Sequence, residues 1–250
     1  MAAGGTAVHA EELSVPPPVP GYAPNEGPLR GSAWAGADLR STRLAGRDLR
    51  GSDLRDADLR GGDLQGAILR AADLTGANLQ DADLTGADLR AVKLSGARLR
   101  GAYLRSADLR GADLRDVEFR GADLRDANIG RALLSGAQLQ AVDLRGAKLA
   151  GAYLRGADLA AADASKADLT GAVLRDVDWM QTLLDGTELQ EADLRGARHL
   201  SCEQLTRASH WDRAYRDPGH ACGVARPLPR EEQLQATPPV AAGGDDVAPE

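Results

Sequence analysis

The chain has 250 residues, only 3% of them aromatic, with a single Phe. This composition excludes a core built from large aromatic rings. The formal net charge of −7 argues against a nucleic-acid binder that works through a basic surface. No apolar run reaches 18 residues, and the N-terminus lacks both a basic start and an apolar stretch of secretory length. We therefore expect a soluble, cytoplasmic protein that does not bind membranes.

Residues 1–30 form the first segment. They include the run Val-Pro-Pro-Pro-Val-Pro at 15–20 and carry three acidic residues against one basic residue. A segment of this composition is expected to be disordered or extended.

Residues 31–198 repeat with a period of five. Every fifth position from Trp34 to Leu194 is apolar, and 28 of these 33 positions are Leu. The exceptions are Trp34, Phe119, Ile129, Ala164 and Trp179. Two residues before each of these positions stands a second regular one, which is Ala in 22 cases and Val in four. The register never slips, so no loop interrupts the series.

Neither an α-helix nor a flat strand can use this period. Five residues advance a helix by about 500°, which would spread the Leu residues over every face. An odd spacing in a strand would send successive Leu residues to opposite faces. A chain that turns about a right angle every five residues places both apolar positions inside a square coil of 20 residues. Coils stacked at about 4.8 Å would give about eight turns and a tube of roughly 40 Å.

The units resemble the pentapeptide-repeat family, whose consensus is A(D/N)LXX. Matching triplets begin at Ala57, Ala77, Ala87, Ala107, Ala122, Ala157 and Ala167. The resemblance covers about two thirds of the chain. It implies an all-β fold, the right-handed quadrilateral β-helix, and the handedness rests on the resemblance alone.

The first coil is the weakest part of the expected tube. Its inward small positions are Ser32, Thr42, Arg47 and Ser52. Burying an unpaired guanidinium is costly, so we expect Arg47 to leave through the open end.

The outer surface is expected to carry an ion-pair lattice. The residue before each Leu is most often Asp, and the residue after it is often Arg. Stacking at 20 residues places Asp88 and Asp108 beside Arg90 and Arg110, for example. Neighbouring rows of opposite charge relieve the repulsion within each row.

One outward column departs from this rule. Leu133, Tyr153 and Val173 stand 20 residues apart on one face, with Arg155 and Arg175 beside them. Exposed apolar patches often mark interfaces, so this stripe is a candidate interaction surface. Chance substitution is the alternative interpretation.

Residues 199–217 predict a C-terminal helix. Ser201 and Gln204 are spaced as a capping box, and the Asp-Pro-Gly sequence at 217–219 would stop the helix. Its apolar side would consist of Leu205, Ala208, Trp211, Ala214 and Tyr215. This side would form either a lid over the last coil or the contact of a homodimer, since several members of the family pair through their C-terminal ends. The protein would accordingly be a monomer or a homodimer.

Residues 218–250 are expected to form a disordered acidic tail. Cys202 and Cys222 lie outside the periodic region, and in a reducing compartment two unpaired thiols are the default expectation.

The composition of the tube disfavours catalysis, and we expect no enzyme, no cofactor and no metal site. There is no His between Ala10 and Arg198, so no general base of the usual kind lies on the tube. Cys202, His210, His220 and Cys222 fit none of the usual zinc-ligand spacings.

Two functions remain for a tube without chemistry. The first is a protein-binding module or scaffold with an unknown partner. The second follows from the resemblance, because some family members protect DNA gyrase or another topoisomerase from quinolones and similar inhibitors by mimicking DNA. Residues 31–200 hold 26 acidic and 24 basic residues, and a DNA mimic needs a strongly negative face. The charge therefore favours the first function.

Overall fold

The computed structural model describes residues 29–217 and Cys222. The Pro-rich segment predicted at 1–30 lies outside the described residues except for its last two. The acidic tail predicted at 218–250 lies outside them except for Cys222. Within the described part of the chain, no helix has the length and apolar character needed to span a bilayer.

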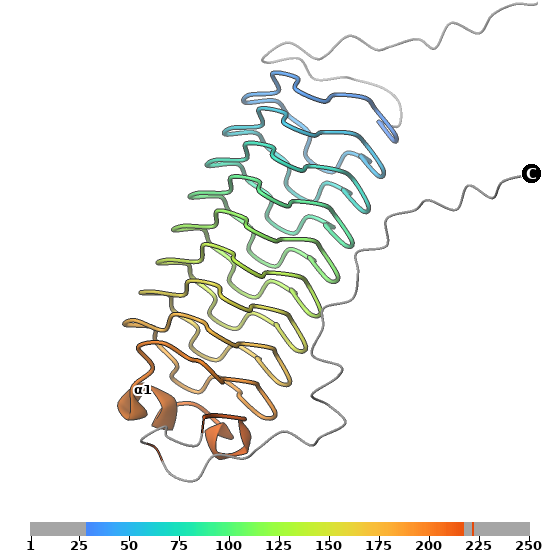
Figure 1. Cartoon of the computed structure of the whole chain (residues 1–250). Coiled ribbons are helices and arrows are strands. Elements are labelled where there is room, and N and C mark those ends of the chain that lie inside the picture. The colour runs from blue at the N-terminus through green and yellow to red at the C-terminus, as the bar shows by residue number, and fades with distance from the viewer. Residues whose placement is uncertain (1–28, 218–221, 223–250) are drawn as a thin grey trace, which may run out of the picture.

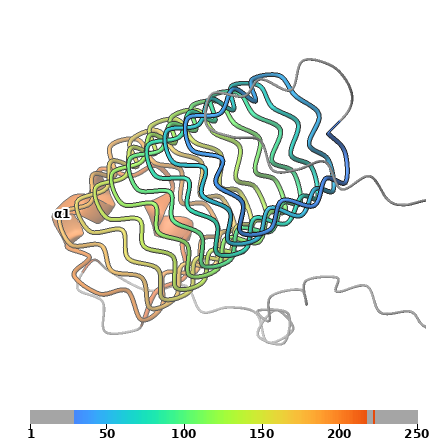
Figure 2. The same cartoon turned by 90° about the horizontal axis from the view of Figure 1, so that it is seen from above.

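The periodic region forms a tube of stacked coils. Parallel bridges join each outward residue to the residue 20 positions later, without a break from Ala33 with Asp53 to Asp178 with Arg198. Four units make one coil, so the 33 units give eight coils and one further unit. Figure 1 shows the coils stacked into a straight, narrow tube, and Figure 2 shows the same stack from above. The predicted β-helix is confirmed, and its handedness stays a prediction.

The interior of the tube is filled by the two apolar positions of each unit. All Leu residues at the fifth positions are at most 2% exposed, and the large rings of Phe119 and Trp179 are enclosed. Burying a Leu side chain contributes about 1.5–3 kcal/mol, so the axis is the main source of stability. Arg47 is half-buried, and the path of its guanidinium through the open end stays a prediction.

Four of the five backbone N–H groups in a unit are used by the backbone itself. In the unit 107–111 we name the successive positions small, outward, central, following and corner. The small N–H donates back across the turn to Leu104, and the outward N–H donates to the preceding coil. The central and corner N–H groups donate to carbonyls of the next coil along the chain, at 2.7 and 3.1 Å. The fifth N–H, at the following position, has no backbone acceptor in this pattern.

Every corner residue from Gly36 to Gly196 has a positive φ. Together with the hydrogen bond across the turn, this is the arrangement of a type II turn, whose third residue is preferably Gly. The left-handed conformation costs other residues roughly 1–2 kcal/mol. Several corners are nevertheless Asp.

Each corner Asp lies directly before a Gly in the next coil. A Cβ added to Gly76 would overlap the carboxylate oxygen of Asp56, whereas a Cβ on Gly86 would meet nothing within 4 Å. The five pairs are Asp56 with Gly76, Asp81 with Gly101, Asp116 with Gly136, Asp126 with Gly146, and Asp176 with Gly196. A corner Asp therefore favours Gly one coil later.

Gly76→Ala should destabilise the tube more than Gly86→Ala. Both substitutions place Ala at a positive φ, which costs about 1 kcal/mol. Only Ala at 76 also displaces the Asp56 carboxylate, at a further cost of about 0.5–1 kcal/mol. Urea denaturation should show this difference, and Asp56→Gly should remove it in a double-mutant cycle. Equal losses for the two Ala variants would contradict the account.

The C-terminal segment departs from the prediction of one helix over 199–217. Helix α1 spans only Cys202–Thr206, and a short 3₁₀ helix, η1, spans Trp211–Arg213. The capping box is confirmed, because the Ser201 hydroxyl accepts from the Gln204 amide and the Gln204 side chain accepts from the Ser201 amide.

The long helix is wrong because the last coil needs hydrogen-bond partners along its edge. Ser209 bridges to Glu188 and Tyr215 bridges to Asp193. The N–H groups of Leu189 and Leu194 donate to the carbonyls of Ser209 and Tyr215 at 3.0 and 2.8 Å. Helical backbone would use those carbonyls itself, so the segment continues the ladder instead.

The expectation of two unpaired thiols is also wrong. Cys202 and Cys222 form a disulfide with their Cα atoms 5.4 Å apart, within the usual range. Both residues lie outside the tube in sequence, but the folded C-terminal segment brings them together. The disulfide joins the start of α1 to residue 222.

Candidate interaction surfaces

The outward Asp completes the hydrogen bonding of its own unit. The carboxylate of Asp108 accepts from the backbone N–H of Arg110 at 3.2 Å, which is the one N–H that the coils leave over. Every Asp and Asn at an outward position of the tube accepts this bond, at 2.9–3.4 Å. Sequence reasoning missed this role. The sequence signal was that the outward position is so often Asp or Asn, because these two side chains are short enough to accept from the backbone N–H two residues later.

The predicted ion-pair lattice is confirmed. The guanidinium of Arg110 donates to both oxygens of Asp108, with Nε–Oδ1 at 2.9 Å and Nη2–Oδ2 at 2.6 Å. Arg90 adds a longer contact to the same carboxylate from the preceding coil, at 3.7 Å. The guanidiniums remain substantially exposed, and such pairs typically contribute 0–1 kcal/mol each. The lattice therefore neutralises the surface more than it stabilises the fold.

The same contacts lower the pKa of Asp38 and Asp48, two outward carboxyls near the N-terminal end of the tube. Hydrogen bonding from the Arg50 side chain, helped by the backbone amide of Arg50, lowers the pKa of Asp48 from 3.8 to about 2, although desolvation opposes the shift. The pKa of Asp38 falls to about 2 for the corresponding reason beside Arg40. These carboxylates stay ionised throughout the neutral range.

Asp108→Ala should destabilise the tube by about 1–2 kcal/mol, because it removes the acceptor of the Arg110 amide. Asp108→Asn should cost less than half as much, because Asn keeps that acceptor, as Asn78 does for Gln80 at 3.2 Å. Urea denaturation would measure both changes. If the two variants lose equal stability, the ion pair rather than the amide bond is what the position supplies.

The structure places the predicted stripe in one continuous ladder. Leu133 bridges to Tyr153, Tyr153 to Val173, and the column continues through Asp193 to Tyr215. Leu133 is only 8% exposed, whereas Tyr153 and Val173 are half-buried. The accessible part of the stripe is therefore its C-terminal two thirds.

The arginines beside the stripe pair with acids elsewhere. Arg155 lies 3.3 Å from Asp176, and Arg175 lies 3.8 Å from Asp193. Neither has an outward Asp in its own unit, because those places are taken by Tyr153 and Val173. In the units of the stripe, the hydrogen bond from the following N–H to an outward carboxylate and the bidentate ion pair are therefore both missing.

The apolar residues predicted for a cap or a dimer contact face the last coil of their own chain. Leu205 and Ala214 are fully buried, Ala208 and Tyr215 are almost fully buried, and Trp211 packs at the margin of the core. The Arg216 guanidinium lies 5.0 Å from the centre of the Trp211 ring. These side chains are therefore buried within their own chain.

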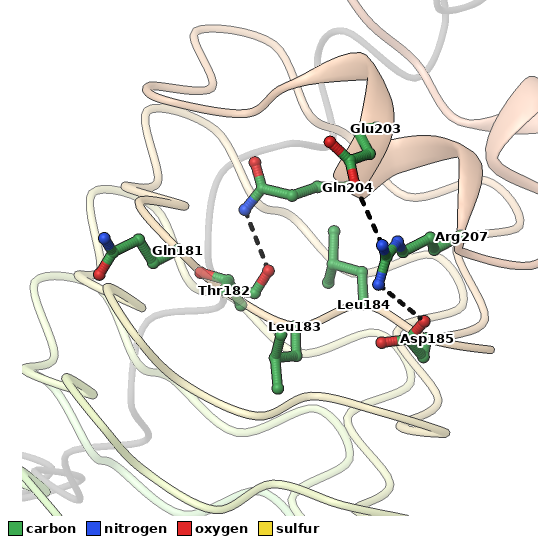
Figure 3. Close-up of a pocket in the computed structure, with 8 residues that line it drawn as sticks. All are labelled: Gln181, Thr182, Leu183, Leu184, Asp185, Glu203, Gln204 and Arg207. Atoms are coloured by element: carbon green, nitrogen blue, oxygen red, sulfur yellow. Dashed lines mark hydrogen bonds and ion pairs between the residues drawn. The ribbon is translucent and has the colours of Figure 1, made fainter.

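A groove lies between α1 and the last full coil, as Figure 3 shows. Arg207 bridges the groove, 3.0 Å from Glu203 and 3.5 Å from Asp185. The Gln204 side chain donates to the carbonyl of Thr182 at 3.0 Å. The groove has a volume of about 430 Å³ and is lined by Gln181, Thr182, Leu183, Leu184, Asp185, Glu203, Gln204 and Arg207.

Sequence reasoning also missed the exposed apolar residues at this end. Met180 and Leu183 are 49% and 48% exposed, and Leu183 lines the groove. The sequence signal was that Met180 stands at a following position, where Arg is usual, and Leu183 at an outward position, where Asp is usual. Among the residues that line the groove, the only contacts between an acidic and a basic side chain are those of Arg207 with Glu203 and Asp185.

The two histidines in the described part of the chain contact acids of the last coils. His199 lies 2.8 Å from Asp178, and His210 lies 2.7 Å from Glu188. Both contacts fasten the C-terminal segment to the tube. Within residues 29–217 and Cys222, no three His, Cys, Asp or Glu side chains are grouped to hold a metal ion.

Comparison with known proteins identifies the series of units. The profile of the family described as pentapeptide repeats matches in eight copies that together span residues 35–198. The chain belongs to the pentapeptide-repeat family. A search of curated proteins gave no significant match.

Two solved members of the family are similar in structure. HetL, a pentapeptide repeat protein involved in heterocyst differentiation regulation from the cyanobacterium Nostoc sp. strain PCC 7120, is 36% identical. That match covers 74% of this chain and 81% of HetL, with a TM-score of 0.58. A trypsin-treated form of QnrB1, a plasmid-mediated fluoroquinolone resistance protein, is 22% identical. It also has a TM-score of 0.58, over 75% of this chain and 91% of QnrB1, and this likeness concerns the fold alone.

Proposed function

We propose that the protein is a non-enzymatic binding module whose tube presents side chains to a protein partner. The observation that carries this proposal is the stripe of Leu133, Tyr153 and Val173. At these three positions the unit gives up the acceptor for its own amide in consecutive coils, a bond of about 0.5–1.5 kcal/mol. If these side chains are kept for binding a partner, the same hydrogen-bond acceptor would be lost repeatedly on one face, as it is here.

Tyr153→Asp separates folding from binding. Asp restores the acceptor for the Arg155 amide and a bidentate partner for its guanidinium, so the free energy of unfolding should stay equal or rise. Capture of the partner from a lysate of the native host, quantified against immobilised wild-type protein, should fall by about tenfold, a loss of roughly 1.4 kcal/mol.

Ile68→Asp is the matched control. Ile68 is another half-buried apolar residue at an outward position, followed by Arg70, but it lies on a different column. Its replacement should stabilise the tube in the same way and leave capture unchanged. Equal capture by the Tyr153→Asp variant and the wild type would remove the stripe from the proposal.

Protection of DNA gyrase or another topoisomerase is the second hypothesis. The tubular fold shared with QnrB1 supports it. The charge does not, because the outward Asp residues are largely matched by Arg, as the pair of Asp108 and Arg110 illustrates. A mimic of duplex DNA needs an unneutralised negative face.

Purified protein should accordingly leave quinolone-stabilised DNA cleavage by gyrase unchanged at equimolar and tenfold excess. A known gyrase-protecting protein of the same family would serve as the positive control. Dose-dependent suppression of cleavage would reverse the order of the two hypotheses.

A further inference from the structure

One face of the tube combines arginines with amides and has few acids. Four consecutive coils contribute outward and following residues to it. We call these eight residues the amide–arginine face: Asn78, Gln80, Arg98, Arg100, Glu118, Arg120, Gln138 and Gln140. The bridges from Asn78 through Arg98 and Glu118 to Gln138 place its outward residues in one column.

The three arginines of this face lack the bidentate carboxylate partner that ten other arginines of the tube have. Arg110 donates to both oxygens of Asp108, and nine other arginines at following positions bind their outward Asp in the same way. Within residues 29–217, Arg98, Arg100 and Arg120 form no ion pair. All three are exposed.

The absence of pairs has a simple local cause. Arg98 occupies the outward position that would hold the Asp for Arg100. Glu118 occupies the corresponding position before Arg120, and its carboxylate forms no ion pair within the described residues. The four units of the face contain two acids, Glu118 and the corner residue Asp81, against three guanidiniums. Asp58 and Asp158 continue the outward column at its two ends, and Asp158 accepts from the Gln140 side chain.

The surroundings extend the basic character around one coil only. The coil of residues 92–111 contains five basic residues and one acid, Asp108, whereas the preceding coil, 72–91, contains four acids and one base. Tyr103, at the next outward position of the basic coil, is 52% exposed. A nucleic acid, with a charge about every 1.7 Å along its axis, would extend over the acidic coil as well. On this face the acidic coil presents the amides Asn78 and Gln80, so a short segment can set its carboxylates on the arginines and its backbone on the amides.

We propose that the amide–arginine face binds an acidic segment of a protein partner. The guanidiniums of Arg98, Arg100 and Arg120 receive its Asp or Glu side chains in the bidentate geometry that the tube uses internally. The amides of Gln80 and Gln138 bond its backbone, and Tyr103 packs against its edge. This inference rests on the proposed protein-binding function and names the chemistry of the partner.

The test is fluorescence anisotropy with a labelled 12-residue peptide of alternating Glu and Ser, at 50 mM and 300 mM salt. A peptide of Gln and Ser and a 12-nucleotide oligothymidine are the comparison probes. The full-length wild-type protein should bind the Glu peptide saturably and more tightly than either comparison probe. Binding should weaken at the higher salt.

The decisive variant replaces Arg98 by Asn and both Arg100 and Arg120 by Gln. These are the residues that the same face already carries one coil away, so the tube should fold normally. Arg40→Gln, Arg60→Gln and Arg110→Gln, combined in one protein, make the same change in net charge at paired arginines. The first variant should bind the Glu peptide at least tenfold more weakly, and the control should stay within threefold of wild type.

Three results would overturn the inference: no binding by the wild type, equal weakening in both variants, or equally tight binding of the oligothymidine. Failure here is distinguishable from failure of the proposed function. Partner capture that depends on Tyr153 but not on these arginines would leave the binding module intact and remove the acidic-segment site.

Discussion

In each unit with an outward Asp, the backbone N–H of the residue after the central one donates to the carboxylate of that Asp. The surface of this tube depends on this hydrogen bond. Neighbouring coils and the turn use four N–H groups of each unit, and the side chain of an Asp or Asn such as Asp108 takes the fifth. An amide without a protein acceptor must rely on water. The outward position is therefore structural first, and a departure from Asp or Asn there has a local cost.

The departures consequently show where other requirements act. On one face they are apolar, at Leu133, Tyr153 and Val173, and around one coil they are basic or aromatic, at Lys93, Arg98 and Tyr103. Elsewhere Arg pairs neutralise the acids, so the net charge of the chain says little about any particular face. The specificity of such a tube lies in these interruptions rather than in the repeat.

The period was sufficient to predict the coil and its core, because only a right-angled chain encloses both apolar positions of a five-residue unit. The capping box at Ser201 was also predictable, since both of its hydrogen bonds are local. The length of α1 was not, because the demand of the last coil for edge partners such as Ser209 is a tertiary effect. The Cys202–Cys222 disulfide likewise depends on how the C-terminal segment folds back. The amide role of Asp escaped notice because sequence shows the residue and not its acceptor distance.

Amide hydrogen exchange, followed by NMR, tests the structural role of the outward carboxylate most directly. Arg105 and Arg110 occupy the following position in adjacent units of the same coil, after Tyr103 and Asp108 respectively. Only the Arg110 amide has a carboxylate acceptor, at 3.2 Å. The account predicts that the Arg110 amide exchanges at least tenfold more slowly than the Arg105 amide. Equal exchange of the two amides would contradict it.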